Sequence, residues 1–225
     1  MRMLKKYWIE CFLMLFSLSC TSPYNVNIVA TIQSGNLELV VADNLFTSVN
    51  SSNDQTKQLT ELSATEYLIG DQSIQSFNLV SNKSEPIENE IGKGTKYTFK
   101  GINELTGIEK HIEIIQYDSV PDMLFLNTSF TNGSQKDVLV KELKTNNYQI
   151  LNQGDNPPFW GFQGSSSSAR ADWIKPIEEG YYQKNYMGMN NSDYGGGIPV
   201  VDIWRPDGGI VIGHTAMTPK LISLP

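Results

Sequence analysis

The sequence predicts an all-β protein made of antiparallel strands. After residue 25, apolar residues recur at every second position in short runs, and glycine, asparagine and proline lie between the runs. We find no run there with the apolar spacing of an amphipathic helix. Many short alternating runs separated by turn signals are typical of a β-sandwich or barrel. The 225 residues are enough for one large β domain or two small ones.

The first two strands are predicted to form a hairpin. Apolar and polar residues alternate over residues 26–32 and again over 37–41, with Gly35-Asn36 between them. A glycine–asparagine pair between two alternating runs is a hairpin signal. The serine- and asparagine-rich residues 43–63 then predict a long loop or an irregular sheet edge.

Further short strands are predicted as far as residue 151. Their spans are 67–69, 74–80, 97–99, 108–117, 123–130, 138–143 and 148–151. Gly107 and the Asn132-Gly133-Ser134 run supply turns, and Pro121-Asp122 ends one strand. His111 falls among the charged residues of its run, so we expect its side chain to face solvent.

Residues 1–19 have the layout of a bacterial lipoprotein signal peptide. Basic residues lie within the first six positions, a short apolar run follows at 12–18, and Ser17-Leu18-Ser19 leads into Cys20. We therefore expect Cys20 to become the lipidated N-terminus and residues 20–27 to form a tether. An ordinary signal peptide with an incidental cysteine is the alternative. The protein is predicted to lie in the cell envelope, lipid-anchored at the outer membrane or in the periplasm, or to be secreted.

Composition argues against several functional classes. The net charge of −7 argues against a nucleic-acid partner, which needs a basic surface. Cys11 leaves with the signal peptide and Cys20 is acylated, so the fold is expected to depend on a hydrophobic core without a disulfide. His111 and His214 have no neighbouring ligands at metal-binding spacing, so neither a metal nor a cofactor is predicted.

The residues after 156 have the composition of a carbohydrate-binding surface. Three of the four tryptophans lie there, together with acidic residues and the glycine run 195–197. Aromatic rings stack on the apolar faces of sugars, and carboxylates accept hydrogen bonds from hydroxyls. Asp202 should share a strand face with Val200 and Trp204, which suits an interface or the rim of a pocket. Turn-forming roles are the alternative for the aspartates, and for Trp160 a core position is favoured over a stacking platform, as for other tryptophans of a sandwich.

Four segments resemble a known family. They are FWGFQG, ARADW, QKNYMGMNNSDYGGGIPVVDIW and GHTAMTPKLISLP. They resemble the N-terminal β-supersandwich domain of bacterial α-galactosidases of the melibiase type, particularly the large multidomain ones of Bacteroidetes. The resemblance is strong over 156–225 and weaker over 28–150, where IGKG and LFLNTSFTNGS fit. It implies a β-supersandwich over residues 28–225.

The resemblance also implies a function. In that family of glycoside hydrolases a (β/α)₈ barrel follows the sandwich and supplies an aspartate nucleophile and an aspartate acid/base for retaining hydrolysis. This chain ends about where the barrel should begin, so we expect it to be the non-catalytic N-terminal portion of a secreted α-galactosidase that acts on α-galactoside-containing glycans. Whether the chain is itself an enzyme is left open.

The same resemblance points to candidate substrate-contacting residues, and two alternatives to the proposed function remain. The loops around Trp160, Trp173, Asp193 and Tyr194 are the candidates for closing over the barrel mouth and contacting substrate. One alternative is a stand-alone carbohydrate-binding lipoprotein on the cell surface. Another is a sandwich that neither binds nor catalyses.

Overall fold

The computed structural model of the protein describes residues 26–52, 57–151, 157–163, 174–178, 180–181, 200–206, 208–213 and 215. These residues form fifteen β-strands and no helix, and all the strand pairings are antiparallel. The all-β prediction is confirmed. The predicted signal peptide and Cys20 lie outside these ranges. Within them, no helix is long and apolar enough to cross a membrane.

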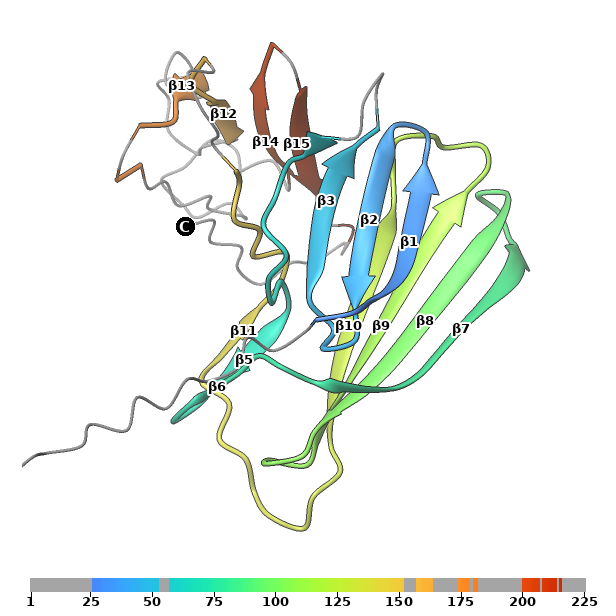
Figure 1. Ribbon diagram of the computed structural model, residues 1–225, viewed down its shortest axis with the longest axis vertical. Coiled ribbons are helices and arrows are strands. Elements are labelled where there is room, and N and C mark those ends of the chain that lie inside the picture. Colours follow the sequence, from blue (N-terminus) through green and yellow to red (C-terminus); the bar gives the residue numbers. More distant parts are fainter. Residues whose placement is uncertain are drawn as a thin grey trace, which may run out of the picture.

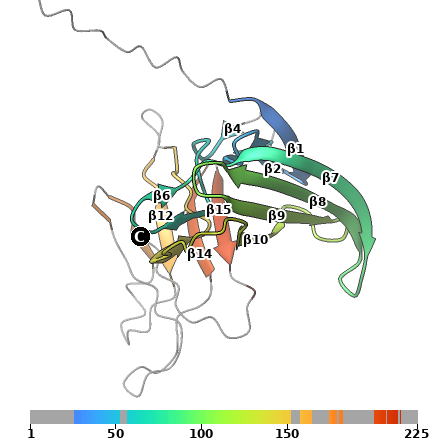
Figure 2. The same cartoon turned by 90° about the horizontal axis from the view of Figure 1, so that it is seen from below.

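Two four-stranded sheets pack against each other. The first sheet has the order β1-β2-β3-β4, with β1 (Ile28–Ser34), β2 (Leu37–Ala42), β3 (Thr47–Ser51) and β4 (Lys57–Gln58). The second sheet has the order β10-β9-β8-β7, with β7 (Asn78–Glu88), β8 (Lys93–Asn103), β9 (Ile108–Tyr117) and β10 (Phe125–Asn132). Figure 1 shows the first sheet lying across the second. In Figure 2, β7 and β8 are the long, curved strands of the second sheet.

The core lies between these two sheets. Ile32 and Leu39 of the first sheet are buried in one cluster with Phe99, Ile112 and Ile114 of the second. These residues alternate with more exposed neighbours, because successive side chains of a strand point to opposite faces. Burying each of these side chains stabilises the fold by about 1.5–3 kcal/mol.

A charged pair is buried within this apolar core. Lys110 of β9 is fully buried, and its Nζ donates hydrogen bonds to the carbonyls of Glu66 at 2.8 Å and of Leu45 at 3.5 Å. The same Nζ lies 3.5 Å from Glu66 Oε2 and 5.6 Å from the centre of the Phe77 ring. Burial lowers the pKa of Lys110, and the charge of Glu66 partly opposes that effect. Burial raises the pKa of the neighbouring Tyr148 hydroxyl, and the charge of Glu66 adds to the rise.

The serine-rich segment after β2 contains more regular structure than its composition indicates. β3 lies in the interior of the first sheet between β2 and β4, and its Thr47 and Ser48 are buried. Hydroxyl groups are tolerated there because they find partners. Thr47 Oγ1 bonds to Thr65 Oγ1, and Thr60 Oγ1 accepts a hydrogen bond from the N–H of Val49 at 2.8 Å. Of the two alternatives for residues 43–63, the long loop is wrong for residues 47–51, whereas the two-residue edge strand β4 agrees with an irregular sheet edge.

Two further sheets flank the sandwich. The third sheet, of order β11-β5-β6, contains β5 (Tyr67–Ile69), β6 (Ser73–Ile74) and β11 (Glu142–Lys144). The fourth sheet, of order β13-β12-β14-β15, contains β12 (Trp160–Gln163), β13 (Ile174–Pro176), β14 (Val200–Arg205) and β15 (Gly208–Gly213). Figure 1 places the third sheet below and the fourth above, on the same side of the sandwich.

Candidate functional site

The two faces of the fourth sheet are set by its register. Trp160 is the Cα partner of Trp204, and Phe162 is the partner of Asp202. Side chains alternate between the faces of a strand, so these four residues share one face. Ile174 of β13 and Val211 of β15 continue that face, because they are the partners of Phe162 and Asp202. We call these six residues the aromatic face.

The opposite face of the fourth sheet holds it to the sandwich. Val201 and Arg205 of β14 are buried there, and the Arg205 guanidinium lies 4.4 Å from the centre of the Phe159 ring. Ile210 of β15 packs against the sandwich core. The fourth sheet therefore has one anchored face, and the aromatic face is turned away from it.

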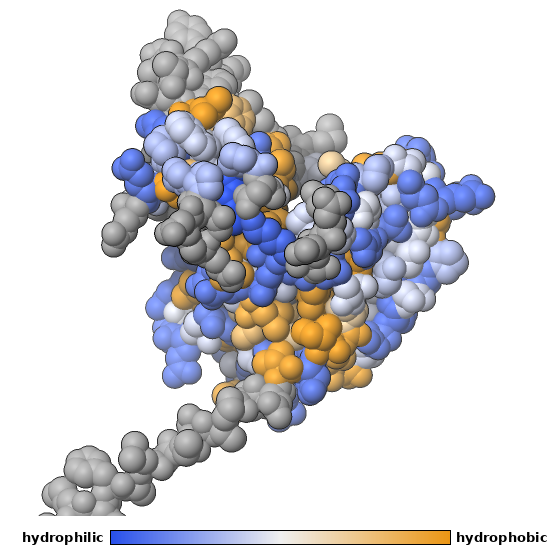
Figure 3. Space-filling model, turned by 45° about the horizontal axis from the view of Figure 1, so that its top comes forward, coloured by the Kyte–Doolittle hydropathy of each residue, from blue (hydrophilic) through white to orange (hydrophobic). Residues whose placement is uncertain are grey.

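The aromatic face is partly open to solvent. Trp160 keeps 41% of its surface exposed, and Ile174 and Val211 are more exposed still. Phe162, Asp202 and Trp204 are intermediate. Figure 3 shows apolar surface in the upper part of the molecule, where Figure 1 places β12 and β13. A core role for Trp160, the position favoured above, does not agree with this exposure.

Glycine makes room for one of the two tryptophans. Gly209 of β15 is the Cα partner of Trp204. A Cβ atom at position 209 would lie 2.7 Å from the Cβ of Trp204 and 2.5 Å from the carbonyl oxygen of Ile203. Only a residue without a side chain fits this approach, so Gly209 keeps the strand and its indole in place.

Asp202 is the carboxylate of the aromatic face. Its partial burial raises its pKa above the ordinary value of 3.8. In the described part of the chain its carboxylate takes part in no hydrogen bond or ion pair. It is therefore free to accept hydrogen bonds from a ligand.

This arrangement can bind a flat, partly apolar ligand with hydroxyl groups. Directly opposite side chains in an antiparallel pair lie about 4.5–5.5 Å apart at Cβ, so Trp160 and Trp204 make a continuous aromatic surface. The face offers one acceptor, Asp202, and no second carboxylate. Among the described residues no group of three or more His, Cys, Asp or Glu could hold a metal ion.

The sequence located part of this face. The prediction that Asp202 and Trp204 share a strand face is confirmed. Of the predicted substrate-contacting residues, Trp160 lies on the aromatic face, whereas Trp173, Asp193 and Tyr194 lie outside the described residues, as does His214. The contact of Trp160 with sugar stays a prediction. The sequence missed Phe162 as a member of the face, and the strand period of two in FWGFQG was the signal that could have found it.

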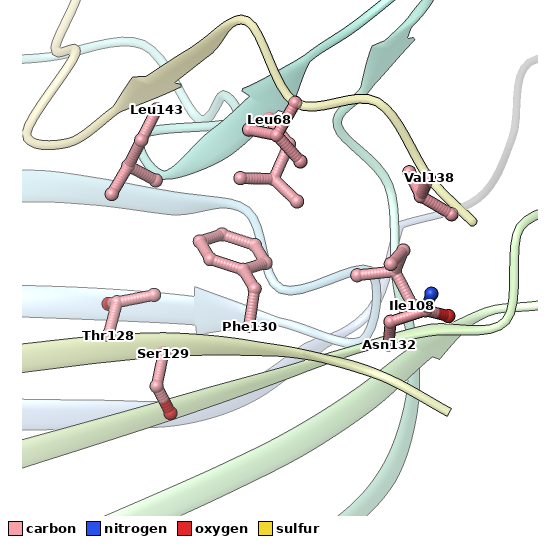
Figure 4. Close-up of a pocket in the computed structure, with 9 residues that line it drawn as sticks. Leu68, Ile108, Thr128, Ser129, Phe130, Asn132, Val138 and Leu143 are labelled. Carbon is pink, nitrogen blue, oxygen red and sulfur yellow. The ribbon is translucent and has the colours of Figure 1, made fainter. Parts of the chain in front are cut away.

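A second hollow is apolar and belongs to the packing between sheets. A cavity of about 380 Å³ lies between β10 and the third sheet. Figure 4 shows the Phe130 ring pointing toward Leu68 and Leu143. Asn132 lines this cavity, and its side-chain amide is already hydrogen-bonded. Its Nδ2 donates to the Lys136 carbonyl, and its Oδ1 accepts from Ser134. This cavity therefore has little to offer a polar ligand.

No protein-family model matches the chain, and no curated protein matches it.

Proposed function

We propose that this chain is the non-catalytic, carbohydrate-binding N-terminal portion of a secreted α-galactosidase. The aromatic face carries the proposal, because it combines two exposed or half-exposed indoles with an unpaired carboxylate. Two of the segments that resemble the melibiase-type family, FWGFQG and the end of the DYGGGIPVVDIW segment, are the strands β12 and β14 that build it.

In this proposal the enzyme's chemistry belongs to a downstream barrel. Retaining hydrolysis of a terminal α-galactoside needs two carboxyl groups about 5–5.5 Å apart. Among the six described residues of the aromatic face Asp202 is the one carboxylate, so in this proposal the face holds glycan and the barrel cleaves it. A lipid on Cys20 would tether the protein to the cell envelope. If so, Cys20→Ala should move the protein from the membrane fraction to the soluble fraction, and an unchanged distribution would contradict the anchor.

Calorimetric titration with an α-galactoside disaccharide tests the binding. We expect Trp160→Ala to weaken binding about tenfold, which corresponds to the loss of about 1.4 kcal/mol of stacking. Leu105→Ala is the matched control, because Leu105 is 97% exposed in the turn between β8 and β9 and should leave binding unchanged. Equal affinities for the wild type and Trp160→Ala would contradict a binding role for this face.

An activity assay tests the non-catalytic part. The purified chain should not turn over an aryl α-galactoside. Turnover that a single carboxylate substitution abolishes would place catalysis in this chain and overturn that part of the proposal.

A further inference from the structure

A polar hollow lies on the outer face of the second sheet. Lys100, His111 and Ser129 lie side by side across β8, β9 and β10, because His111 is the Cα partner of both Lys100 and Ser129. Glu109 is likewise the partner of Ile102 and Thr131 in the next row. These residues line a hollow of about 300 Å³, within the usual size range of small-ligand sites.

This hollow faces away from the sandwich core. Lys110 and Ile112, the neighbours of His111 along β9, are buried inside the sandwich, so His111 points to the other side of the sheet. β10 shows the same alternation in Figure 4, where Phe130 points toward Leu68 and Ser129 is turned to the opposite side of the strand. The hollow is therefore separate from the core and from the aromatic face.

A β-bulge adds an apolar wall to the hollow. The pairing of β7 with β8 shifts register between Leu79 and Ser81, so Val80 is an extra residue opposite Lys100 and Gly101. Bulges commonly redirect a side chain at a functional surface. Val80 lines the hollow and is 68% exposed, so its side chain is available to contact a ligand there.

Two polar atoms on this face of the sheet lack hydrogen-bond partners. They are His111 Nε2, whose residue lines the hollow, and Thr98 Oγ1, which lies outside its lining; both are buried in the described structure. Thr98 is the partner of Glu113, one row from the Lys100–His111 pair and on the same face. Buried polar atoms are hydrogen-bonded in the great majority of cases, and leaving one unpaired costs about 1–3 kcal/mol. A ligand whose own hydroxyl groups enter the hollow would remove that cost for His111.

The lining fits a neutral, polyhydroxylated ring. Lys100 donates hydrogen bonds, Glu109 accepts them, and Ser129, Thr131 and His111 can do either. A simple anion would meet the Glu109 carboxylate, and a cation would meet the Lys100 ammonium. A pyranose needs both donors and acceptors for its hydroxyl groups and an apolar surface for its C–H face, which Val80 and Ile102 provide.

We propose that this hollow is a second saccharide-binding site that takes a neutral pyranose. It goes beyond the function proposed above, because it does not involve the aromatic face. If one long glycan bound to both sites, its second contact would form within a complex that already exists. Such a glycan would be held more tightly than a monosaccharide.

Chemical-shift mapping of the full chain with methyl α-galactoside locates the site directly. We expect saturable shifts of the amides of residues 98–102, 109–111 and 129–131, and we expect these shifts to persist in Trp160→Ala. A titration to 50-fold ligand excess that leaves these amides unmoved would overturn the proposal. Shifts here but not at β12 and β14 would support this site and contradict the function proposed for the aromatic face.

Variants then test the chemistry of the hollow. Ser129→Ala combined with Thr131→Val should weaken this binding about tenfold or more, and His111→Ala should do the same. Asn127→Ala, an exposed change on the same face of β10 outside the hollow, is the control and should bind normally. If His111→Ala does not fold, the double variant decides alone. Binding of galacturonate in preference to the neutral sugar would contradict the assignment of a neutral ligand.

Discussion

In the sandwich, Phe77 and Phe99 are wholly buried and Lys110 is buried with them. In the fourth sheet, Trp160 is exposed over two fifths of its surface, and Asp202 has no partner among the described residues. Both regions thus combine aromatic and charged groups. In the sandwich the carbonyls of Leu45 and Glu66 and one oxygen of the Glu66 carboxylate hold Lys110 Nζ, whereas the Asp202 carboxylate of the aromatic face is left without a partner among the described residues. Groups that the fold itself does not consume are those that can serve a ligand.

Phe77 and Trp160 should therefore respond differently to truncation. Phe77→Ala removes a fully buried ring and should lower the free energy of unfolding by about 3–5 kcal/mol. Trp160→Ala should lower it by less than about 1 kcal/mol, because the ring is only partly buried and surface substitutions have small effects. Urea denaturation measures both values. Equal losses would break the distinction between a structural and a ligand-facing aromatic residue.

Breaking the buried ion pair should have an effect of similar size. Lys110→Met leaves the Glu66 carboxylate buried without its cation and should destabilise the protein by about 3–5 kcal/mol. Lys110→Met combined with Glu66→Leu should recover much of that loss, since no unpaired charge remains. A double variant as unstable as Lys110→Met alone would show that the carbonyl hydrogen bonds of Lys110, and not its charge pairing, dominate.

Gly209 tests how tightly the aromatic face is built. Gly209→Ala places a methyl group against the backbone of Ile203 and Trp204 and should cost about 1–3 kcal/mol, with weaker sugar binding as Trp204 shifts. Val211→Ala is the comparison on the same strand, and its exposed side chain should make it nearly silent in stability. Thermal unfolding and calorimetric titration together separate the two outcomes.

The smallest expected effect is a dependence on pH through Asp202. Its folded pKa lies above the unfolded value near 3.8, so the stability it contributes is present below that value and is lost as pH rises through the folded pKa. The stability of Asp202→Asn relative to wild type should thus rise slightly from pH 3 to pH 6. Sugar binding by the wild type should strengthen over the same pH range, because the ionised carboxylate is the better acceptor. A pH-independent difference in melting temperature would show that Asp202 is not desolvated.

Local signals in the sequence predicted the strands well. Residues 67–69 and 108–117 match β5 and β9, and Gly35 adopts the positive φ of 58° that its turn needs. Alternation and turn residues act over a few positions, so the sequence displays them directly. The predicted strand at 148–151 instead contributes only the isolated bridge between Ile150 and Thr60.

The pairing of strands that lie far apart in the sequence could not be predicted from these local signals. β12 and β14 lie about 40 residues apart in sequence, so the pairing of Trp160 with Trp204 could not be predicted from either segment alone. Lys110 points to the same side of β9 as the buried isoleucines, and alternation alone does not show which group pairs with its charge. Its partner Glu66 is 44 residues away. The division of the β region into four sheets, and not one sandwich alone, depends on such distant pairings.

The edge strands β7 and β15 differ in how readily they can pair with a strand of another chain. β7 ends the second sheet with Lys83, Glu85 and Pro86 along it, and charges and proline on an edge strand prevent further strand addition. Among the described strands, β15 ends the fourth sheet with the sequence GGIVIG, which contains neither. Self-association of the purified protein should therefore begin at β15, and a lysine in place of the exposed Val211 should raise the concentration at which it stays monomeric.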